Sequence, residues 1–154
     1  MKYEIILLGK TKDNFLSSGM AEYLKRLQHY TDVQIKIIKN KKIQGNDDLI
    51  KEKEADLLLS NLQPSTYAIA LDGRGRSYTS IEFSKRITHW ESLNHRHITF
   101  IIGGPLGLSE RLLAAVQEKI SFSKMTFTHD MIRLFLLEQL YRAYTIKAGE
   151  KYHK

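Results

Sequence analysis

Short apolar segments alternate with amphipathic segments along the whole chain, and this alternation restricts the fold more than any other feature. The apolar runs have the length of strands and lie at residues 3–8, 33–37, 67–71, 98–102 and 119–122. The amphipathic segments have helical spacing and lie at about residues 15–28, 46–62, 79–90, 109–116 and 128–147. Such alternation is typical of a mostly parallel sheet with helices on both faces. The sequence therefore predicts an α/β fold, with a single domain over residues 1–154.

Local signals predict some of the element boundaries. Thr79 and Glu82 have the spacing of a capping box, which begins a helix. Gly149 is expected to end the last helix, because glycine tolerates the left-handed conformation found after many helix ends. The segment Lys39-Asn40-Lys41-Lys42 is predicted to be a basic loop.

The composition excludes several kinds of chemistry. The chain has no cysteine, which excludes disulfides, thiol catalysis and a cysteine zinc site. The histidines and acids show no metal-ligand spacing, so no metal is expected, and the absence of a G-x-S-x-G motif argues against a serine hydrolase. The start, Met1 to Ile5, is expected to begin a strand and not a signal peptide. No apolar run approaches the roughly 20 residues that span a bilayer, so a cytoplasmic protein without membrane contact is expected.

The chain is also basic, with a formal net charge of +7 at pH 7. A positive excess favours polyanionic partners, because each phosphate that a protein neutralises releases counterions. We therefore expect contact with nucleic acid. The alternative is a charge that serves solubility alone.

Two loops rich in small residues follow the last apolar runs and form a candidate ligand site. Gly103 to Gly107 follows the run at 98–102, and Ser121 to Thr126 follows the next run. Ligands of open α/β sheets bind beyond the carboxyl ends of strands, and glycine lets the backbone approach them closely. The pattern G-G-P-L-G is neither a dinucleotide fingerprint nor a P-loop. Taken alone, it is equally compatible with a tight turn between a strand and a helix.

A third loop at the same predicted edge carries two guanidinium groups. It runs from Asp72 to Arg76 and follows the buried run at 67–71. We favour phosphate contact by Arg74 and Arg76, because guanidinium groups bind phosphate oxygens in pairs of hydrogen bonds. The alternative is a solvated turn.

The last predicted helix is apolar nearly all round, which indicates burial on two faces. Ile132, Phe135 and Leu140 mark one face, and Leu137 and Tyr144 mark another. A small domain can hardly cover both faces by itself. The sequence therefore predicts a two-fold homodimer.

Two polar features of this helix are candidates for a role. Glu138 and Arg142 have the i, i+4 spacing of an ion pair, which would act as a clamp if an interface buries it. His129, at the helix start, is a weak catalytic candidate. The favoured interpretation of His129 is a side chain that packs on a neighbour beside the helix cap.

The C-terminal motifs resemble those of a known family. They are Ile102-Gly103-Gly104-x-x-Gly107, Ser121-Phe122-Ser123-Lys124-Met125-Thr126-Phe127, His129, Arg133, Glu138-Gln139-x-Tyr141-Arg142-Ala143 and Tyr152-His153-Lys154. Together they resemble the SPOUT-class ribosomal RNA large subunit methyltransferase H family. The resemblance covers the whole chain, including Leu8-Gly9-Lys10 near its start. Each motif is weak alone, but the set is highly specific.

This resemblance implies a SPOUT α/β knot and a cofactor. The chain from about Gly103 onward would thread through a loop and form a deep C-terminal trefoil knot, which would hold S-adenosylmethionine in a bent conformation. Leu71 and Phe122 would contact the adenine, and backbone groups would bind its edge and the ribose. By matching position, the residues expected to bind the cofactor are Leu71, Gly103, Phe122, Ser123, Lys124, Met125, Thr126 and Phe127.

The resemblance also implies a homodimer and a substrate. The family methylates N3 of a pseudouridine in the intersubunit-bridge hairpin of 23S rRNA, within the large subunit or the assembled ribosome. We hypothesise that the tail ending in Tyr152, His153 and Lys154 folds over the site with Arg142 nearby, so the predicted catalytic residues are His153, Tyr152 and Arg142. The chain departs from the usual family pattern at Thr128, where proline is common, and at Asp130, where glutamine is common.

Three alternatives come from other functional classes. They are a knotted methyltransferase of another RNA, such as a tRNA 2′-O enzyme, an RNA-binding ribosome-associated protein without catalysis, and a nucleotide-binding regulator. The position of the methylated nucleotide would separate the first from the favoured function. Failure to bind S-adenosylmethionine would favour the second, and a preference for mononucleotides the third.

Overall fold

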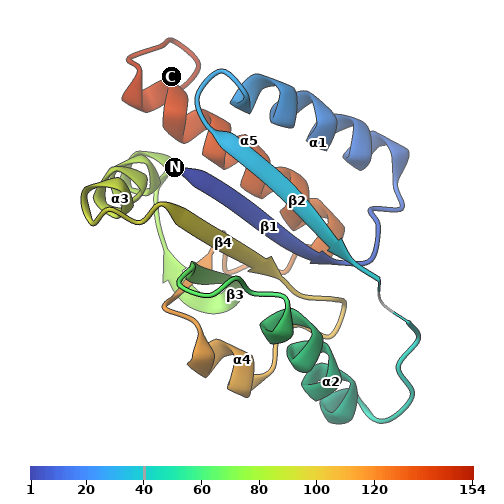
Figure 1. Cartoon of the computed structure of the whole chain (residues 1–154). Coiled ribbons are helices and arrows are strands. Elements are labelled where there is room, and N and C mark those ends of the chain that lie inside the picture. Colours follow the sequence, from blue (N-terminus) through green and yellow to red (C-terminus); the bar gives the residue numbers. More distant parts are fainter. Residues whose placement is uncertain (40) are drawn as a thin grey trace.

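The computed structural model describes residues 1–39 and 41–154, and within them the chain forms five strands and five helices (Figure 1). The strands are β1 Lys2–Leu8, β2 Asp32–Ile38, β3 Tyr67–Ser77, β4 His97–Ile102 and β5 Glu118–Ser121. The helices are α1 Asn14–Leu27, α2 Asp47–Ser60, α3 Ser80–Ser92, α4 Glu110–Ala115 and α5 His129–Lys147. One parallel sheet has the strand order β2-β1-β4-β3-β5. The predicted α/β fold is confirmed. The predicted basic loop falls partly on Asn40, which lies outside the described residues.

The helices cover both faces of the sheet, with α1, α3 and α5 on one face and α2 and α4 on the other (Figure 1). Successive residues of a strand point to opposite faces, so β1 supplies both layers of the core. Ile5 and Leu7 are buried with side chains of α1, α3 and α5, whereas Ile6 and Leu8 are buried with those of α2 and α4. A nearly continuous apolar run is therefore what a central parallel strand requires.

Side-chain caps begin α2 and α3, close to where the sequence predicts these helices to start. Thr79 and Glu82 form both hydrogen bonds of the capping box before α3. The Asn46 side chain accepts a hydrogen bond from the backbone N–H of Leu49 at 2.8 Å. Gly149 has a φ of +70° and follows α5, as predicted. These caps satisfy backbone groups that the helix itself leaves unpaired.

Strand β3 is longer than the sequence predicts, because the segment expected to be a loop returns to the sheet. Leu71 and Arg76 both pair with Ile120 of β5, so residues 72–75 bulge out between them. A Cβ atom on Gly75 would lie 2.5 Å from the backbone N of Ile120, so only glycine allows this approach. The trefoil knot implied by the family resemblance remains a prediction.

The chain itself covers most of α5. This helix packs between α1 and α3, and Leu136, Leu137, Leu140 and Ala143 are fully buried. Met131 and Phe135, near its N-terminal end, are only partly buried. The neighbouring helices α1 and α3 thus cover most of the two apolar faces that suggested a dimer. The apolar pattern of a helix shows that its faces are buried, but it does not show which segment of the chain buries them.

Candidate active site

A cavity of about 620 Å³ lies at the carboxyl ends of β4 and β5, beside the start of the bulge in β3. This is the edge at which open α/β sheets bind ligands, and the volume lies within the range of roughly 300–1,000 Å³ found for small-molecule sites. The lining includes every residue predicted to bind a cofactor: Leu71, Gly103, Phe122, Ser123, Lys124, Met125, Thr126 and Phe127. It also includes residues outside that prediction, among them Leu108, Ile120, His129 and Ile132.

The glycine-rich loop after β4 forms one wall of the cavity. The backbone N–H of Gly107 donates to the carbonyl of Gly104 at 3.0 Å, which closes a tight turn. Gly107 has a φ of +82°, a conformation that side chains disfavour. A Cβ atom on Gly103 would lie 2.9 Å from Cδ2 of Leu108. The loop is therefore both a tight turn and a cavity wall, so the two interpretations of the sequence are compatible.

The segment after β5 forms the opposite wall. The Ser121 hydroxyl donates to the carbonyl of Ser123 at 3.0 Å, and the Ser123 hydroxyl accepts from the N–H of Met125 at 2.9 Å. These local bonds shape the segment without a regular element. Thr128 then caps α5 by accepting from the N–H of Met131 at 3.3 Å. The Thr128 hydroxyl thus caps α5 at the position where the sequence departs from the expected family pattern.

Arg74 connects parts of the chain at this edge, and its predicted contact with phosphate stays a prediction. Its Nε donates to Oδ1 of Asp72 at 2.8 Å, and its Nη2 donates to the carbonyl of Leu108 at 3.2 Å. Its Nη1 pairs with Glu110 at the start of α4. Because these acceptors use most of the guanidinium donors, Arg74 ties the bulge after Leu71 to the loop after β4.

A buried arginine fixes the start of α5 against the loop that follows β1. The Arg133 side chain is fully buried and donates to the carbonyls of Leu8 at 2.8 Å and Gly9 at 3.1 Å. It also donates to the hydroxyl of Thr11 at 3.0 Å. These bonds position the rim of the cavity that His129 lines.

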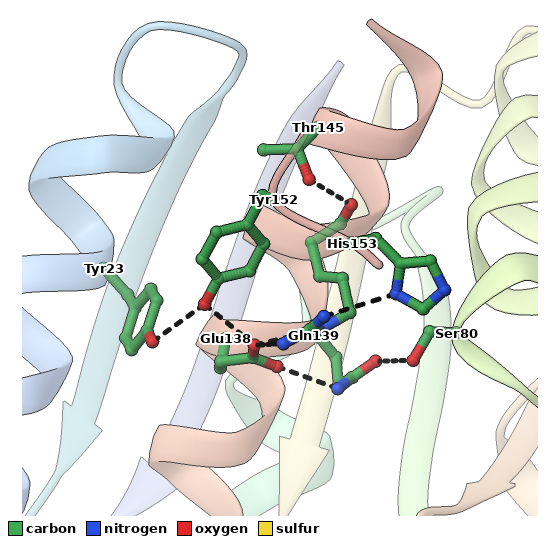
Figure 2. A network of polar contacts seen from close by, with 8 residues as sticks. Tyr23, Ser80, Glu138, Gln139, Thr145, Tyr152 and His153 are labelled. Carbon is green, nitrogen blue, oxygen red and sulfur yellow. Dashed lines mark hydrogen bonds and ion pairs between the residues drawn. The ribbon is translucent and has the colours of Figure 1, made fainter. Parts of the chain in front are cut away.

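The three predicted catalytic residues meet beside the C-terminal half of α5, in what we call the tail cluster: Glu138, Arg142, Tyr152 and His153. Figure 2 shows how Glu138, Tyr152 and His153 lie in this cluster. Nη1 of Arg142 lies 3.2 Å from Nδ1 of His153, and the Arg142 guanidinium stacks over the Tyr152 ring at 4.7 Å. The Tyr152 hydroxyl donates to Oε1 of Glu138 at 3.0 Å, and Nε of Arg142 donates to the same oxygen at 3.0 Å.

The tail is also attached to α1 and to the segment that follows it. The hydroxyls of Tyr152 and Tyr23 are 3.1 Å apart, and the Tyr30 hydroxyl donates to Glu150 at 2.6 Å. Burial raises the pKa of Tyr152, and its hydrogen bonds with Tyr23 and Glu138 raise it further. Tyr152 is therefore a phenol at neutral pH, and the tail is a packed segment of the chain.

The tail cluster and the cavity are separate within one chain. Arg142, Tyr152 and His153 do not line the cavity, whose last lining residue on α5 is Ile132. Arg142 lies ten residues beyond Ile132, about 15 Å along the helix at 1.5 Å per residue. The structure thus brings the predicted catalytic residues together, but it does not fold them over the cavity of the same chain. Glu138 joins them, and its i, i+4 spacing from Arg142 was the sequence signal for that contact.

The surroundings of the site lack metal-ligand clusters and membrane-spanning helices among the described residues. Among residues 1–39 and 41–154, no three or more metal-ligating side chains come together. Within the same residues, no helix is long and apolar enough to cross a membrane.

Comparison with known proteins assigns the class of this fold and site. The family model described as "Predicted SPOUT methyltransferase" matches residues 1–153. The chain is 54% identical, over all of both chains, to ribosomal RNA large subunit methyltransferase H of Desulfotalea psychrophila. Proteins of the same name from Halothermothrix orenii and Clostridium botulinum are 45% and 44% identical to it, again over the whole of each chain.

These matches define a methyltransferase of the SPOUT class. The chain belongs to this family and, within it, to the group of ribosomal RNA large subunit methyltransferases H that these relatives represent. Membership of the family implies a methyl donor as cosubstrate, and membership of this group implies rRNA as the methyl acceptor.

Proposed function

We propose that the chain is an S-adenosylmethionine-dependent methyltransferase that methylates N3 of a pseudouridine in the intersubunit-bridge hairpin of 23S rRNA. The observation that carries the proposal is the cavity at the carboxyl edge of the sheet, because its lining includes all eight residues expected to bind the cofactor. The names of the relatives supply the class of RNA. Such a substrate implies action in the cytoplasm, by one methyltransferase domain that spans the chain.

The lining fits S-adenosylmethionine in shape and in chemistry. Leu71, Ile102 and Phe122 offer apolar surface for a purine ring. The loops at 103–107 and 121–127 offer backbone N–H and carbonyl groups for its edge and for the ribose. Gly103 has no Cβ atom, and a Cβ there would clash with the side chain of Leu108. Glycine therefore allows the backbone and Leu108 to form this wall of the cavity together.

Each part of the chain has a defined task in the reaction. When bound, S-adenosylmethionine would supply a methyl carbon activated by a sulfonium. The cavity walls orient that carbon and exclude water, so the acceptor nitrogen can approach in line. Arg142, Tyr152 and His153 hold the RNA, and the Arg142 charge favours loss of the N3 proton.

The position of the tail cluster makes a homodimer the natural form of the enzyme. In one chain the cluster lies apart from the cavity, so a second copy could bring its own cluster to that cavity. Apolar side chains at the cavity end suit such an interface: Phe15 is 67% exposed, Met125 76% and Phe127 36%. Homodimers with two-fold symmetry are the commonest assemblies of this kind.

Mass spectrometry of large-subunit rRNA from a deletion strain tests this function. We expect the hairpin fragment to lose the mass of one methyl group, and the wild-type gene to restore it. A gene truncated after Gly149 should fail to restore it, because Tyr152 and His153 of the tail cluster are lost. An unchanged fragment in the deletion strain would overturn the proposed function, and restoration by the truncated gene would overturn the role of the tail.

A further inference from the structure

His129 lies where the proposed reaction needs a proton acceptor. It is the first residue of α5 and lines the cavity, and 29% of its side chain is exposed. An imide nitrogen holds its proton until methylation, so a group at the cavity must take that proton. The tail cluster supplies charge and hydrogen bonds but lies apart from the cavity of its own chain.

A carboxylate lies next to the His129 ring. Nε2 of His129 lies 3.2 Å from Oδ1 of Asp130, whose side chain is 16% exposed. The tautomer that carries its proton on Nε2, the nitrogen beside this carboxylate, has its lone pair on Nδ1. Within residues 1–39 and 41–154, Nδ1 makes no hydrogen bond, and His129 lines the cavity.

Asp130 is itself held from two directions. Oδ2 accepts a hydrogen bond from the backbone N–H of Lys12 at 3.4 Å. Nη1 of Arg133 lies 3.4 Å from Oδ1, and Arg133 is fixed by the carbonyls of Leu8 and Gly9. The carboxylate therefore has a defined position before any substrate arrives.

The Asp130 carboxylate favours the positive charge that would develop on the His129 ring during the reaction. Oδ1 is buried, and among the described residues no hydrogen-bond donor is aligned with it, although two nitrogen atoms lie within 3.4 Å. A buried carboxylate oxygen without an aligned donor gains stabilisation when the neighbouring imidazole becomes an imidazolium. This gain arises only after His129 takes a proton.

The geometry points to His129 as the general base that accepts the N3 proton, with Asp130 as the residue that positions it. This inference rests on the proposed function and completes it. The N3–H bond breaks and its proton passes to Nδ1 of His129. The electron pair on N3 forms the bond to the methyl carbon, while the carbon–sulfur bond of the donor breaks and its pair stays on sulfur. One positive charge leaves the sulfonium and one appears on the imidazole beside Asp130.

The ordinary protonation state of His129 suits this role. Burial lowers the pKa of His129, Asp130 raises it in part, and Arg133 and Lys12 lower it again, so the net change is downward. These are the charged groups that face the ring from α5 and from the loop after β1. His129 is thus neutral at pH 7 and able to accept a proton.

The first test measures the methylation rate against pH, with ribosomal substrate and saturating methyl donor. We expect wild-type kcat to be level between roughly pH 7 and pH 9, because the base is already neutral there. His129→Gln should lower kcat at pH 7 by about 100-fold and make the rate rise about tenfold per pH unit, since N3 must then ionise unaided. His89→Gln, on the exposed face of α3, is the matched control and should follow the wild type.

The second test begins with a measurement that needs no methyl donor and no turnover. NMR titration of the ring protons should give His129 a pKa below the ordinary value, and Asp130→Asn should move that pKa further down. The same variant should lower kcat roughly tenfold, because a charge-assisted contact is lost, and Asp130→Glu should recover part of the rate. If Asp130 had a purely structural role, the pKa of His129 would be the same in Asp130→Asn as in the wild type.

The outcomes separate this inference from the proposed function. If the wild type methylates 23S rRNA but His129→Gln keeps a level pH profile and a full rate, His129 is not the base and the proposed function stands. An Asp130→Asn variant with an unchanged His129 titration would overturn the positioning role. If the wild type itself transfers no methyl group to this RNA, the proposed function fails first.

Discussion

The cavity and the tail cluster occupy the two ends of α5, and they are built in different ways. The cavity is formed by backbone: Gly103 and Gly107 shape one wall, and Gly75 lets β5 pass the bulge of β3. The tail cluster is formed by side chains, because Arg142 and Tyr152 both donate hydrogen bonds to Glu138. A site built from backbone is sensitive to any added atom, whereas a site built from side chains depends on particular functional groups.

This difference also separates the two tasks of the enzyme. The cavity is complete within one chain and fits a cofactor that is the same in every methyl transfer. The tail cluster lies away from it and offers the groups that a particular RNA would require. The two ends of α5 can therefore be damaged independently, and the predictions below use that independence.

The largest expected effect comes from adding one carbon atom at the cavity end. In Gly75→Ala, the new Cβ would lie 2.5 Å from backbone atoms of Lys119 and Ile120, which cannot move as a side chain can. We expect the free energy of unfolding to fall by about 3 kcal/mol, as in severe overpacking. Denaturant unfolding followed by circular dichroism measures this loss.

The matched control is Gly73→Ala, two residues earlier in the same bulge. A Cβ at Gly73 would meet no atom within 4 Å, and its φ does not require glycine. Its free energy of unfolding should stay within about 0.5 kcal/mol of the wild type. Equal unfolding curves for the two variants would contradict the tight passage of β5 past the bulge.

A smaller effect is expected from removing the charge at the centre of the tail cluster. Glu138→Gln keeps the size of the side chain but weakens its hold on Arg142 and Tyr152. We expect kcat to fall about tenfold, which corresponds to about 1.4 kcal/mol. The dissociation constant of S-adenosylmethionine should not change, because Glu138 does not line the cavity.

Glu22→Gln gives the matched control for this prediction. Glu22 and Arg26 of α1 have the same i, i+4 spacing, but their side chains are 53% and 41% exposed. Exposed pairs of this kind contribute roughly 0.3–0.5 kcal/mol, so kcat should be unchanged within error. If both glutamine variants lose the same activity, the tail cluster has no special role.

The sequence predicted features that depend on neighbours along the chain. The capping box at Thr79, the end of α5 at Gly149 and the walls at Gly103 and Phe122 follow from local chemistry or from matched motifs. These features therefore agree with the structure.

Features that depend on distant segments could not be predicted in the same way. Arg74 pairs with Glu110, and Tyr152 meets Tyr23, although 36 and 129 residues separate the members of these pairs. The pairing of Arg76 with Ile120 likewise requires β5 to be placed first. The sequence shows the chemical nature of these side chains, but the tertiary structure determines which partner each of them contacts.

Calorimetric titration with S-adenosylmethionine, for the full chain and for the chain truncated after Gly149, tests the central claim most directly. The account predicts that both bind the cofactor with the same dissociation constant, within about twofold, because the cavity lining ends at Ile132. Absence of binding to the full chain, or binding that disappears with the tail, would contradict a cofactor site that is complete without the tail cluster.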